Sequence, residues 1–260
     1  HPMYETPAIT EAADLDRMEP PDFIDKPPPT FQAVVEGMKR VIDTVGDRIP
    51  VGGSLPGTFN VAATLRGMQQ FMIDMTVDPE LFCRTLDLAN TLLIEAGKAY
   101  VAAGCDYIWY PDACSSPTCI SPADFEKYAM PMHEKFFTAM KAFDVYTVYH
   151  PCGVEYGIFC QLPLIPNIDG YHFSNFVDLG IARKVYGAQQ ILWGNLNPAE
   201  VLLFGSPEQV EEEVRRIIES AGKVGAFVLS LGCSLPPVVP PENIDAIMRA
   251  RDKYGKYPMI

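Results

Sequence analysis

Basic residues are scarce in this chain. Its 260 residues include 20 Lys and Arg against 33 Asp and Glu, which gives a formal net charge of −13. A protein with this charge repels nucleic-acid phosphates and anionic lipid headgroups. The composition therefore argues against binding to nucleic acid and against attachment to a membrane surface.

Long apolar runs and a secretion signal are also missing. The uncharged stretch 224–241 contains four prolines, which a membrane-spanning helix would not tolerate. The amino-terminal residues lack the basic and apolar segments of a signal peptide. The seven cysteines are an odd number in a chain long enough to pack its own core, so a secreted disulfide framework is not expected. We therefore expect a reduced, cytoplasmic protein.

Proline is abundant, with 24 residues, and several prolines follow a residue that can cap a helix. Ser206-Pro207 is one example, and Gln209 completes a capping box there. Apolar residues at helical spacing predict helices over 31–45, 79–103, 122–142, 207–221 and 241–253. Short apolar runs between them predict strands over 49–53, 105–110, 145–149, 168–173, 190–193 and 226–231.

Strands that alternate with helices, and that are apolar on both faces, indicate an α/β fold with a buried parallel sheet. Six consecutive βα units favour a barrel or a doubly wound sheet. The first strand is not followed by the G-x-G-x-x-G spacing of dinucleotide-binding folds, which counts against the doubly wound sheet, and we expect a (β/α)8 barrel of the TIM type. Only six strands are visible, so the barrel lacks about two βα units or is open. We expect a single barrel domain over residues 1–260, in which 1–30 form a Pro-rich irregular arm.

Three residues that can bind a metal follow predicted strands. His150 and Cys152 come after the third strand, and Cys233 follows the last one. In a barrel the carboxyl ends of the strands open onto one face, so the three residues would lie on the same face. Catalytic zinc takes three protein ligands. The alternative is that the three residues belong to the hydrophobic core and bind no metal, since Cys is often buried.

Other polar residues after strands are weaker candidates. Asp112 could act as a general acid or orient a zinc ligand, or it could merely cap the next turn. Candidates for hydrogen bonding to a substrate are His172, Asn175, Asn195 and Ser54. His172 could equally be a core residue, because it lies inside a predicted strand.

Three longer motifs resemble those of a known protein family. They are Tyr149-His150-Pro151-Cys152-Gly153, the segment Gly194 to Val210 beginning Gly-Asn-Leu-Asn-Pro, and the segment Gly232 to Ile244 beginning Gly-Cys-Ser-Leu-Pro-Pro. Together they resemble the uroporphyrinogen decarboxylase superfamily. Within it they are similar to the branch of zinc-dependent corrinoid methyltransferases, typified by methylcobamide:coenzyme M methyltransferases. The resemblance implies a (β/α)8 barrel that here lacks the first two βα units.

The resemblance also implies an enzyme that holds zinc through His150, Cys152 and Cys233. It would move a methyl group between a corrinoid (cobalamin) and a small methyl donor or acceptor such as a thiol. The sequence contains no D-x-H-x-x-G corrinoid-binding signature, so the corrinoid would arrive on a partner protein. The alternatives are a decarboxylase of the uroporphyrinogen type and a non-catalytic metal-binding accessory subunit. The sequence leaves the oligomeric state open.

Overall fold

The computed structural model describes residues 6–153 and 155–256, and its contacts divide the chain into two compact units. The first unit holds the described residues up to Tyr149 together with Leu164–Ile168. The second holds the described residues of His150–Pro163 and those from Asp169 onward. Whether the chain forms a single domain stays a prediction. The first five residues of the expected Pro-rich arm lie outside the described residues, and the rest of the arm contains one short helix, α1 (Ala12–Asp16).

The first unit contains three strands and most of the long helices. The strands follow chain order and are β1 (Gly52–Ser54), β2 (Tyr107–Pro111) and β3 (Tyr146–His150), whose last residue is assigned to the second unit. β1 and β2 pair in parallel, with Gly52 opposite Tyr107. The helices are α2 (Pro29–Val45), α3 (Thr58–Arg66), α4 (Met68–Val77), α5 (Pro79–Ala102), α6 (Pro122–Asp124) and α7 (Met130–Met140).

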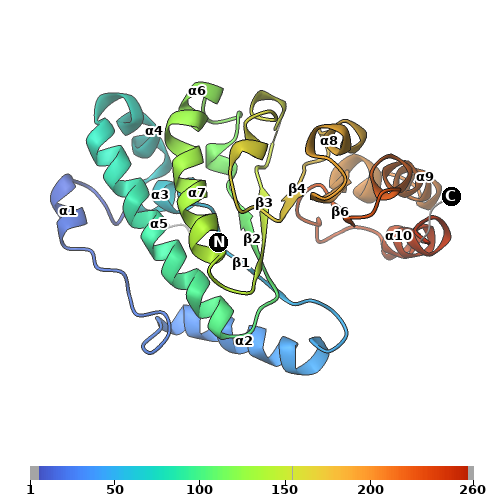
Figure 1. Ribbon diagram of the computed structural model, residues 1–260, viewed down its shortest axis with the longest axis horizontal. Coiled ribbons are helices and arrows are strands. Elements are labelled where there is room, and N and C mark those ends of the chain that lie inside the picture. The colour runs from blue at the N-terminus through green and yellow to red at the C-terminus, as the bar shows by residue number, and fades with distance from the viewer. Residues whose placement is uncertain (1–5, 154, 257–260) are drawn as a thin grey trace. The chain divides into compact units, whose positions relative to one another are not determined.

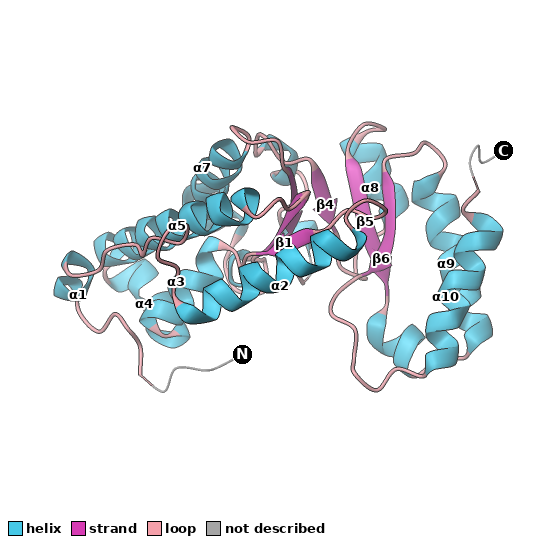
Figure 2. Cartoon of the chain, turned by 90° about the horizontal axis from the view of Figure 1, so that it is seen from below, coloured by secondary structure: helices cyan, strands magenta, loops and turns pink. Residues whose placement is uncertain are grey.

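The second unit repeats the alternation of strand and helix. The parallel strands β4 (Gly170–His172), β5 (Ile191–Leu196) and β6 (Phe227–Leu231) pair in chain order. The helices of this unit are α8 (Leu179–Tyr186), α9 (Pro207–Ile217) and α10 (Pro241–Tyr254), and Figure 2 shows α9 and α10 packed side by side. All six predicted strands are thus confirmed, with shifted ends.

Local sequence explains most helix starts. Asp78 accepts a hydrogen bond from the backbone N–H of Leu81 at the start of α5, and Ser206 forms the predicted capping box with Gln209 at the start of α9. A proline occupies one of the first positions of α2, α5, α6, α7, α9 and α10, where its missing N–H is not needed.

The single helix expected over 122–142 is interrupted. It consists of α6, a π-helical turn (Phe125–Ala129) and α7, which has Pro131 in its first turn. Pro131 cannot donate the backbone hydrogen bond that a continuous α-helix requires, and the wider π turn accommodates that loss. Figure 1 shows α7 running alongside α5 despite this break.

Aromatic side chains fill the core of each unit. In the first unit Phe59, Phe71 and Phe82 contact one another, with ring centroids 4.6 to 5.9 Å apart. In the second unit Tyr171 and Phe173 from the β4 segment contact Tyr186 of α8. No helix in the described part of the chain is both long enough and apolar enough to cross a membrane.

Candidate metal centre at the strand ends of the second unit

The structure brings His150, Cys152 and Cys233 together. One donor atom from each, the imidazole nitrogen or the thiol sulfur, lies within 4.8 Å of the other two. No other group of three or more His, Cys, Asp or Glu residues with this closeness occurs among the residues that the structure describes. His150 ends β3, Cys152 follows it by two residues, and Cys233 follows β6 by two residues.

The three side chains differ in exposure. His150 is buried, Cys152 is half-buried and Cys233 is exposed. Cys152 has a backbone φ of +58° and Gly153 has a φ of +78°. A left-handed conformation is uncommon for a residue with a side chain, so the chain turns sharply at Cys152 at some cost in conformational energy. The turn follows His150 directly and carries the Cys152 thiol back towards it.

Hydrogen bonding fixes the tautomer of His150. Its Nδ1 lies 2.7 Å from the backbone carbonyl oxygen of His172. A carbonyl can only accept, so Nδ1 carries the proton and donates, and Nε2 carries the lone pair. Burial, together with the neighbouring His172 ring, lowers the pKa of His150 to about 4, so the imidazole is neutral at pH 7. A neutral imidazole with Nδ1 tied to a carbonyl is the form in which histidine binds metals.

The donor set fits zinc. Two sulfurs and one imidazole nitrogen are ligands that zinc prefers, and zinc–sulfur bonds of about 2.3 Å place the sulfurs of a tetrahedral site roughly 3.8 Å apart. The observed separations, all within 4.8 Å, need only small side-chain movements to reach that geometry. Three protein ligands leave a fourth position open, which is the arrangement of catalytic zinc sites.

Backbone and side-chain hydrogen bonds hold the segments that carry these donors. The Ser174 hydroxyl donates to the carbonyl of Gly153 at 2.5 Å, next to Cys152. The Asn195 amide donates to the carbonyls of Ser174 and Val177, at 2.8 and 2.6 Å. Both amide hydrogens of Asn195 are therefore used within the protein, and only its amide oxygen could contact a substrate.

The remaining candidates of the second unit are His172 and Asn175. His172 is buried, and its Nε2 donates to the carbonyl of Leu231 at 2.6 Å. Asn175 is half-buried, and its backbone passes so close to Gly232 that a Cβ on Gly232 would lie 2.4 Å from the Asn175 nitrogen. Substrate binding by these residues stays a prediction.

Asp112 and Ser54 belong to the first unit. The Asp112 carboxylate is completely buried and accepts hydrogen bonds from the backbone N–H groups of Phe59 and Asn60, in the first turn of α3. It therefore caps α3 rather than the turn that follows it. Ser54 is exposed at the end of β1. A catalytic role for Asp112 and substrate binding by Ser54 stay predictions.

His133 was not among the residues predicted from the sequence. This residue of α7 is completely buried, and its Nε2 lies 3.1 Å from the Asp112 carboxylate. Nδ1 of His133 is also buried and has no hydrogen-bond partner among the described residues. The sequence shows His133 only as a lone histidine near Phe136 and Phe137, a pattern typical of a core position, and nothing local links it to Asp112.

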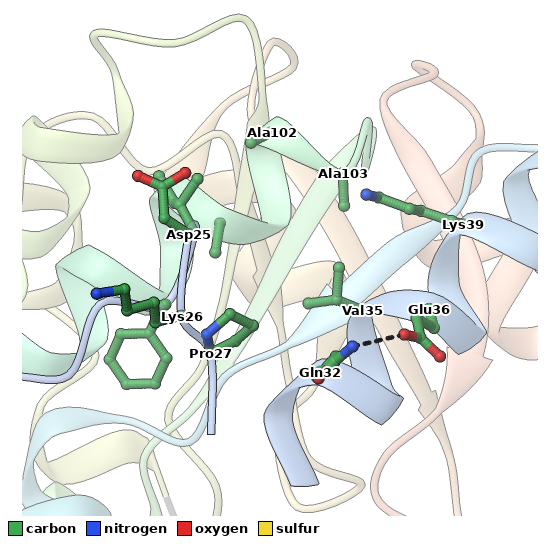
Figure 3. Close-up of a pocket in the computed structure, with 12 residues that line it drawn as sticks. Asp25, Lys26, Pro27, Gln32, Val35, Glu36, Lys39, Ala102 and Ala103 are labelled. Atoms are coloured by element: carbon green, nitrogen blue, oxygen red, sulfur yellow. Dashed lines mark hydrogen bonds between the residues drawn. The ribbon is translucent and has the colours of Figure 1, made fainter. Parts of the chain in front are cut away.

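A cavity of about 420 Å³ lies elsewhere in the first unit, between the amino-terminal arm, α2 and the end of α5 (Figure 3). Its walls carry charged side chains of both signs, among them Asp25, Lys26, Glu36 and Lys39. Ala102 and Ala103, which precede β2, line it as well. The cavity therefore lies near the start of β2, whereas Asp112 follows the end of that strand.

Comparison with known proteins places the chain in a family. Residues 1–254 match the family model described as uroporphyrinogen decarboxylase (URO-D). The chain belongs to the uroporphyrinogen decarboxylase family, which confirms the resemblance inferred from the three motifs.

Two curated relatives represent different activities. The chain is 30% identical over 223 residues to methylcobamide:CoM methyltransferase MtaA of Methanosarcina barkeri, covering 85% of this chain and 63% of the relative. It is 27% identical over 255 residues to uroporphyrinogen decarboxylase of Geobacter metallireducens, covering 93% of this chain and 70% of the relative. The chain thus spans less than two thirds of the length of the methyltransferase.

A solved structure described as a methyltransferase from Methanosarcina mazei matches with a TM-score of 0.79 at 27% identity. The match covers 87% of this chain and 65% of that one. The expected fold class is thereby confirmed: an α/β fold of the TIM-barrel type, shorter than the full barrel.

Proposed function

We propose that this chain is a zinc-dependent methyltransferase that moves a methyl group between a corrinoid, carried by a partner protein, and a small donor or acceptor such as a thiol. The observation that carries the proposal is the group formed by His150, Cys152 and Cys233, whose donor atoms lie within 4.8 Å of one another. The similarity to methylcobamide:CoM methyltransferase MtaA supports it.

Zinc in this site would supply one open coordination position, at which a thiol binds as thiolate and becomes a nucleophile at neutral pH. Two properties of the protein's own residues suit this role. The exposure of Cys233 lets a small molecule reach the group, and the buried His150 presents a neutral imidazole. In the transfer, a sulfur–carbon bond forms while the cobalt–carbon bond of the methylcorrinoid breaks, and its electron pair stays on cobalt.

Decarboxylation of uroporphyrinogen is the second candidate, and similarity to a decarboxylase favours it. Its substrate carries eight carboxylates, which calls for available arginines. Arg66, the arginine nearest to a predicted strand end, is buried and bonded to Asp74 at 2.7 Å and to the backbone carbonyls of Ile9 and Thr10. Its guanidinium thus ties α4 and the arm to α3, and it does not serve a substrate carboxylate.

The test is to incubate zinc-loaded protein anaerobically with methylcobalamin and with coenzyme M, other thiols or tetrahydrofolate. Methyl transfer converts methylcob(III)alamin to cob(I)alamin, which visible spectroscopy detects. We expect conversion with a thiol, and its loss after the metal is removed with a chelator. Full activity in the metal-free sample would overturn the proposed mechanism, and activity of that sample on uroporphyrinogen would support the decarboxylase.

A further inference from the structure

His172 of β4 contacts both segments that carry the proposed zinc ligands. Its backbone carbonyl accepts a hydrogen bond from Nδ1 of His150 at 2.7 Å. Its side-chain Nε2 donates to the carbonyl of Leu231, two residues before Cys233, at 2.6 Å. We propose that His172 is a positioning residue, which fixes the segments bearing His150 and Cys233 relative to each other and so sets the metal affinity of the site. This inference rests on the proposed function, because it requires zinc at the three-residue group.

The contact with His150 determines which imidazole nitrogen can bind a metal. Because the carbonyl of His172 holds the proton on Nδ1, the lone pair lies on Nε2. The two rings also lie close together, with centroids 4.5 Å apart and planes inclined by 32°. The backbone carbonyl and the ring of His172 thus both contact the His150 ring and define its orientation. Hydrogen bonds of this kind to a ligand histidine typically contribute about 10- to 100-fold in metal affinity.

The contact with Leu231 fixes the base of the Cys233 loop. The next residue, Gly232, donates its backbone N–H to the carbonyl of Leu196 at 2.8 Å. A Cβ on Gly232 would clash with the backbone of Asn175, so the chain passes tightly against the segment that follows β4 at this point. Cys233 itself is exposed, and its position therefore depends on how firmly the residues before it are held. The His172 side chain is one of these supports.

The two hydrogen bonds of His172 use different atoms and can exist together. The ring nitrogen Nε2 donates to the carbonyl of Leu231, whereas the backbone carbonyl accepts from Nδ1 of His150. Ser174, two residues beyond His172, holds the carbonyl of Gly153 beside Cys152. The end of β4 thus supports the chain next to all three donor residues.

A substrate-binding role for His172 makes a different prediction. A residue that contacts substrate would change the KM for the thiol when it is replaced and would leave zinc affinity as it was. A positioning residue changes the affinity of the protein for the metal before any substrate is present. The two roles can therefore be separated by metal binding alone.

The experiment compares three variants of the whole chain by competition with a colorimetric zinc chelator and by the visible spectrum of the Co²⁺-loaded protein. His172→Phe keeps a ring but loses the donor, whereas His172→Gln can still donate to the Leu231 carbonyl. Tyr171→Phe is the control, because it removes a buried hydrogen bond of similar length, 2.8 Å to the carbonyl of Leu162, from the adjacent residue of β4.

His172→Phe keeps the backbone carbonyl that binds Nδ1 of His150 and removes only the side-chain bond to the Leu231 carbonyl. We therefore expect it to weaken zinc binding about 10-fold, the lower end of the range for lost supporting hydrogen bonds, and to alter the Co²⁺ spectrum. We expect His172→Gln to recover most of the affinity, and Tyr171→Phe to leave it within about twofold. Unfolding of the metal-free variants in urea corrects for any loss of folded protein. Wild-type affinity in His172→Phe would overturn the positioning role while leaving the proposed function intact. Absence of zinc binding in the wild-type protein would instead defeat the proposed function itself.

Discussion

The carboxylate of Asp112 lies 3.1 Å from Nε2 of His133, and neither side chain has any exposed surface. The same carboxylate accepts the backbone N–H groups of Phe59 and Asn60 at 3.1 and 3.0 Å. Asp112 therefore links the end of β2 to the start of α3 and to α7. A buried acceptor with three donors around it stabilises the first unit, because the donors of the buried residues Phe59 and His133 would otherwise lack a partner.

Replacing Asp112 by Asn should destabilise the protein. The Asn amide keeps one acceptor oxygen but directs an NH2 group towards backbone donors, so at least one buried hydrogen bond is lost. We expect the free energy of unfolding to fall by about 1–3 kcal/mol, measured by urea denaturation. Asp144→Asn, at an exposed position, is the control and should change stability by less than about 0.5 kcal/mol. Equal stability of the two variants would show that the buried contacts of Asp112 contribute little.

Two glycines of the first unit should respond oppositely to alanine. A Cβ on Gly57 would lie 2.2 Å from the Cβ of Asp112, whereas a Cβ on Gly37, inside α2, would meet nothing within 4 Å. Gly57→Ala should lower the free energy of unfolding by about 1–3 kcal/mol through overpacking. Gly37→Ala should raise it by about 0.5–1 kcal/mol, because alanine favours the helix. Thermal unfolding of the two variants checks the difference in sign.

The sequence predicted best those elements whose signals are local. The helix expected over 79–103 is observed as α5, because its cap, its proline and its apolar spacing all lie in one segment. The helix α3 was not predicted. The residue before it, Gly57, has no side chain to cap it, and the cap is Asp112, more than fifty residues further along the chain. A contact at that distance in sequence leaves no pattern in the segment itself.

The same distinction applies to the candidate site. His150, Cys152 and Cys233 could be predicted as a group because each follows a strand, and parallel strands place their ends together. The hydrogen bond of His172 on which its proposed positioning role depends could not be predicted, because it is set by which backbone carbonyl the ring reaches. His133 was missed for the same reason.

The cysteines outside the proposed metal site should differ in reactivity. Burial, with a further contribution from Asp106, raises the pKa of Cys105 to about 11. At pH 8 roughly one such thiol in a thousand is ionised, and only the thiolate reacts. Cys119 and Cys160 are exposed. Brief treatment with iodoacetamide at pH 8 should therefore modify these two and spare Cys105, as mapped by mass spectrometry.

The sign of the pH dependence of this labelling follows from the raised pKa of Cys105. Raising the pH towards 11 increases its thiolate fraction, so its labelling should accelerate by up to tenfold per pH unit. In urea the thiol is exposed, its pKa returns to the ordinary range, and labelling at pH 8 should be fast. Rapid labelling of Cys105 in the native protein at pH 8 would contradict its burial.

Cys233 is the most exposed of the three proposed zinc ligands. If Cys233 binds zinc, Cys233→Ala removes one thiolate and the charge that helps to hold the metal. We expect the wild-type protein to bind about one zinc per chain. In the variant the affinity for zinc should fall by more than about 100-fold, which is more than the loss of a supporting hydrogen bond would cause. Methyl transfer from methylcobalamin should be abolished together with zinc binding.

Stability should respond much less than zinc binding. Cys233 is exposed and lies outside the packed core, so the metal-free variant should unfold within about 0.5 kcal/mol of the metal-free wild-type protein. Cys160→Ala is the matched control, since Cys160 is also an exposed cysteine of the second unit and is not part of the three-residue group. It should retain both zinc and methyl transfer. Undiminished zinc binding by Cys233→Ala would remove Cys233 from the proposed site, because a thiolate ligand of zinc cannot be lost without a fall in affinity.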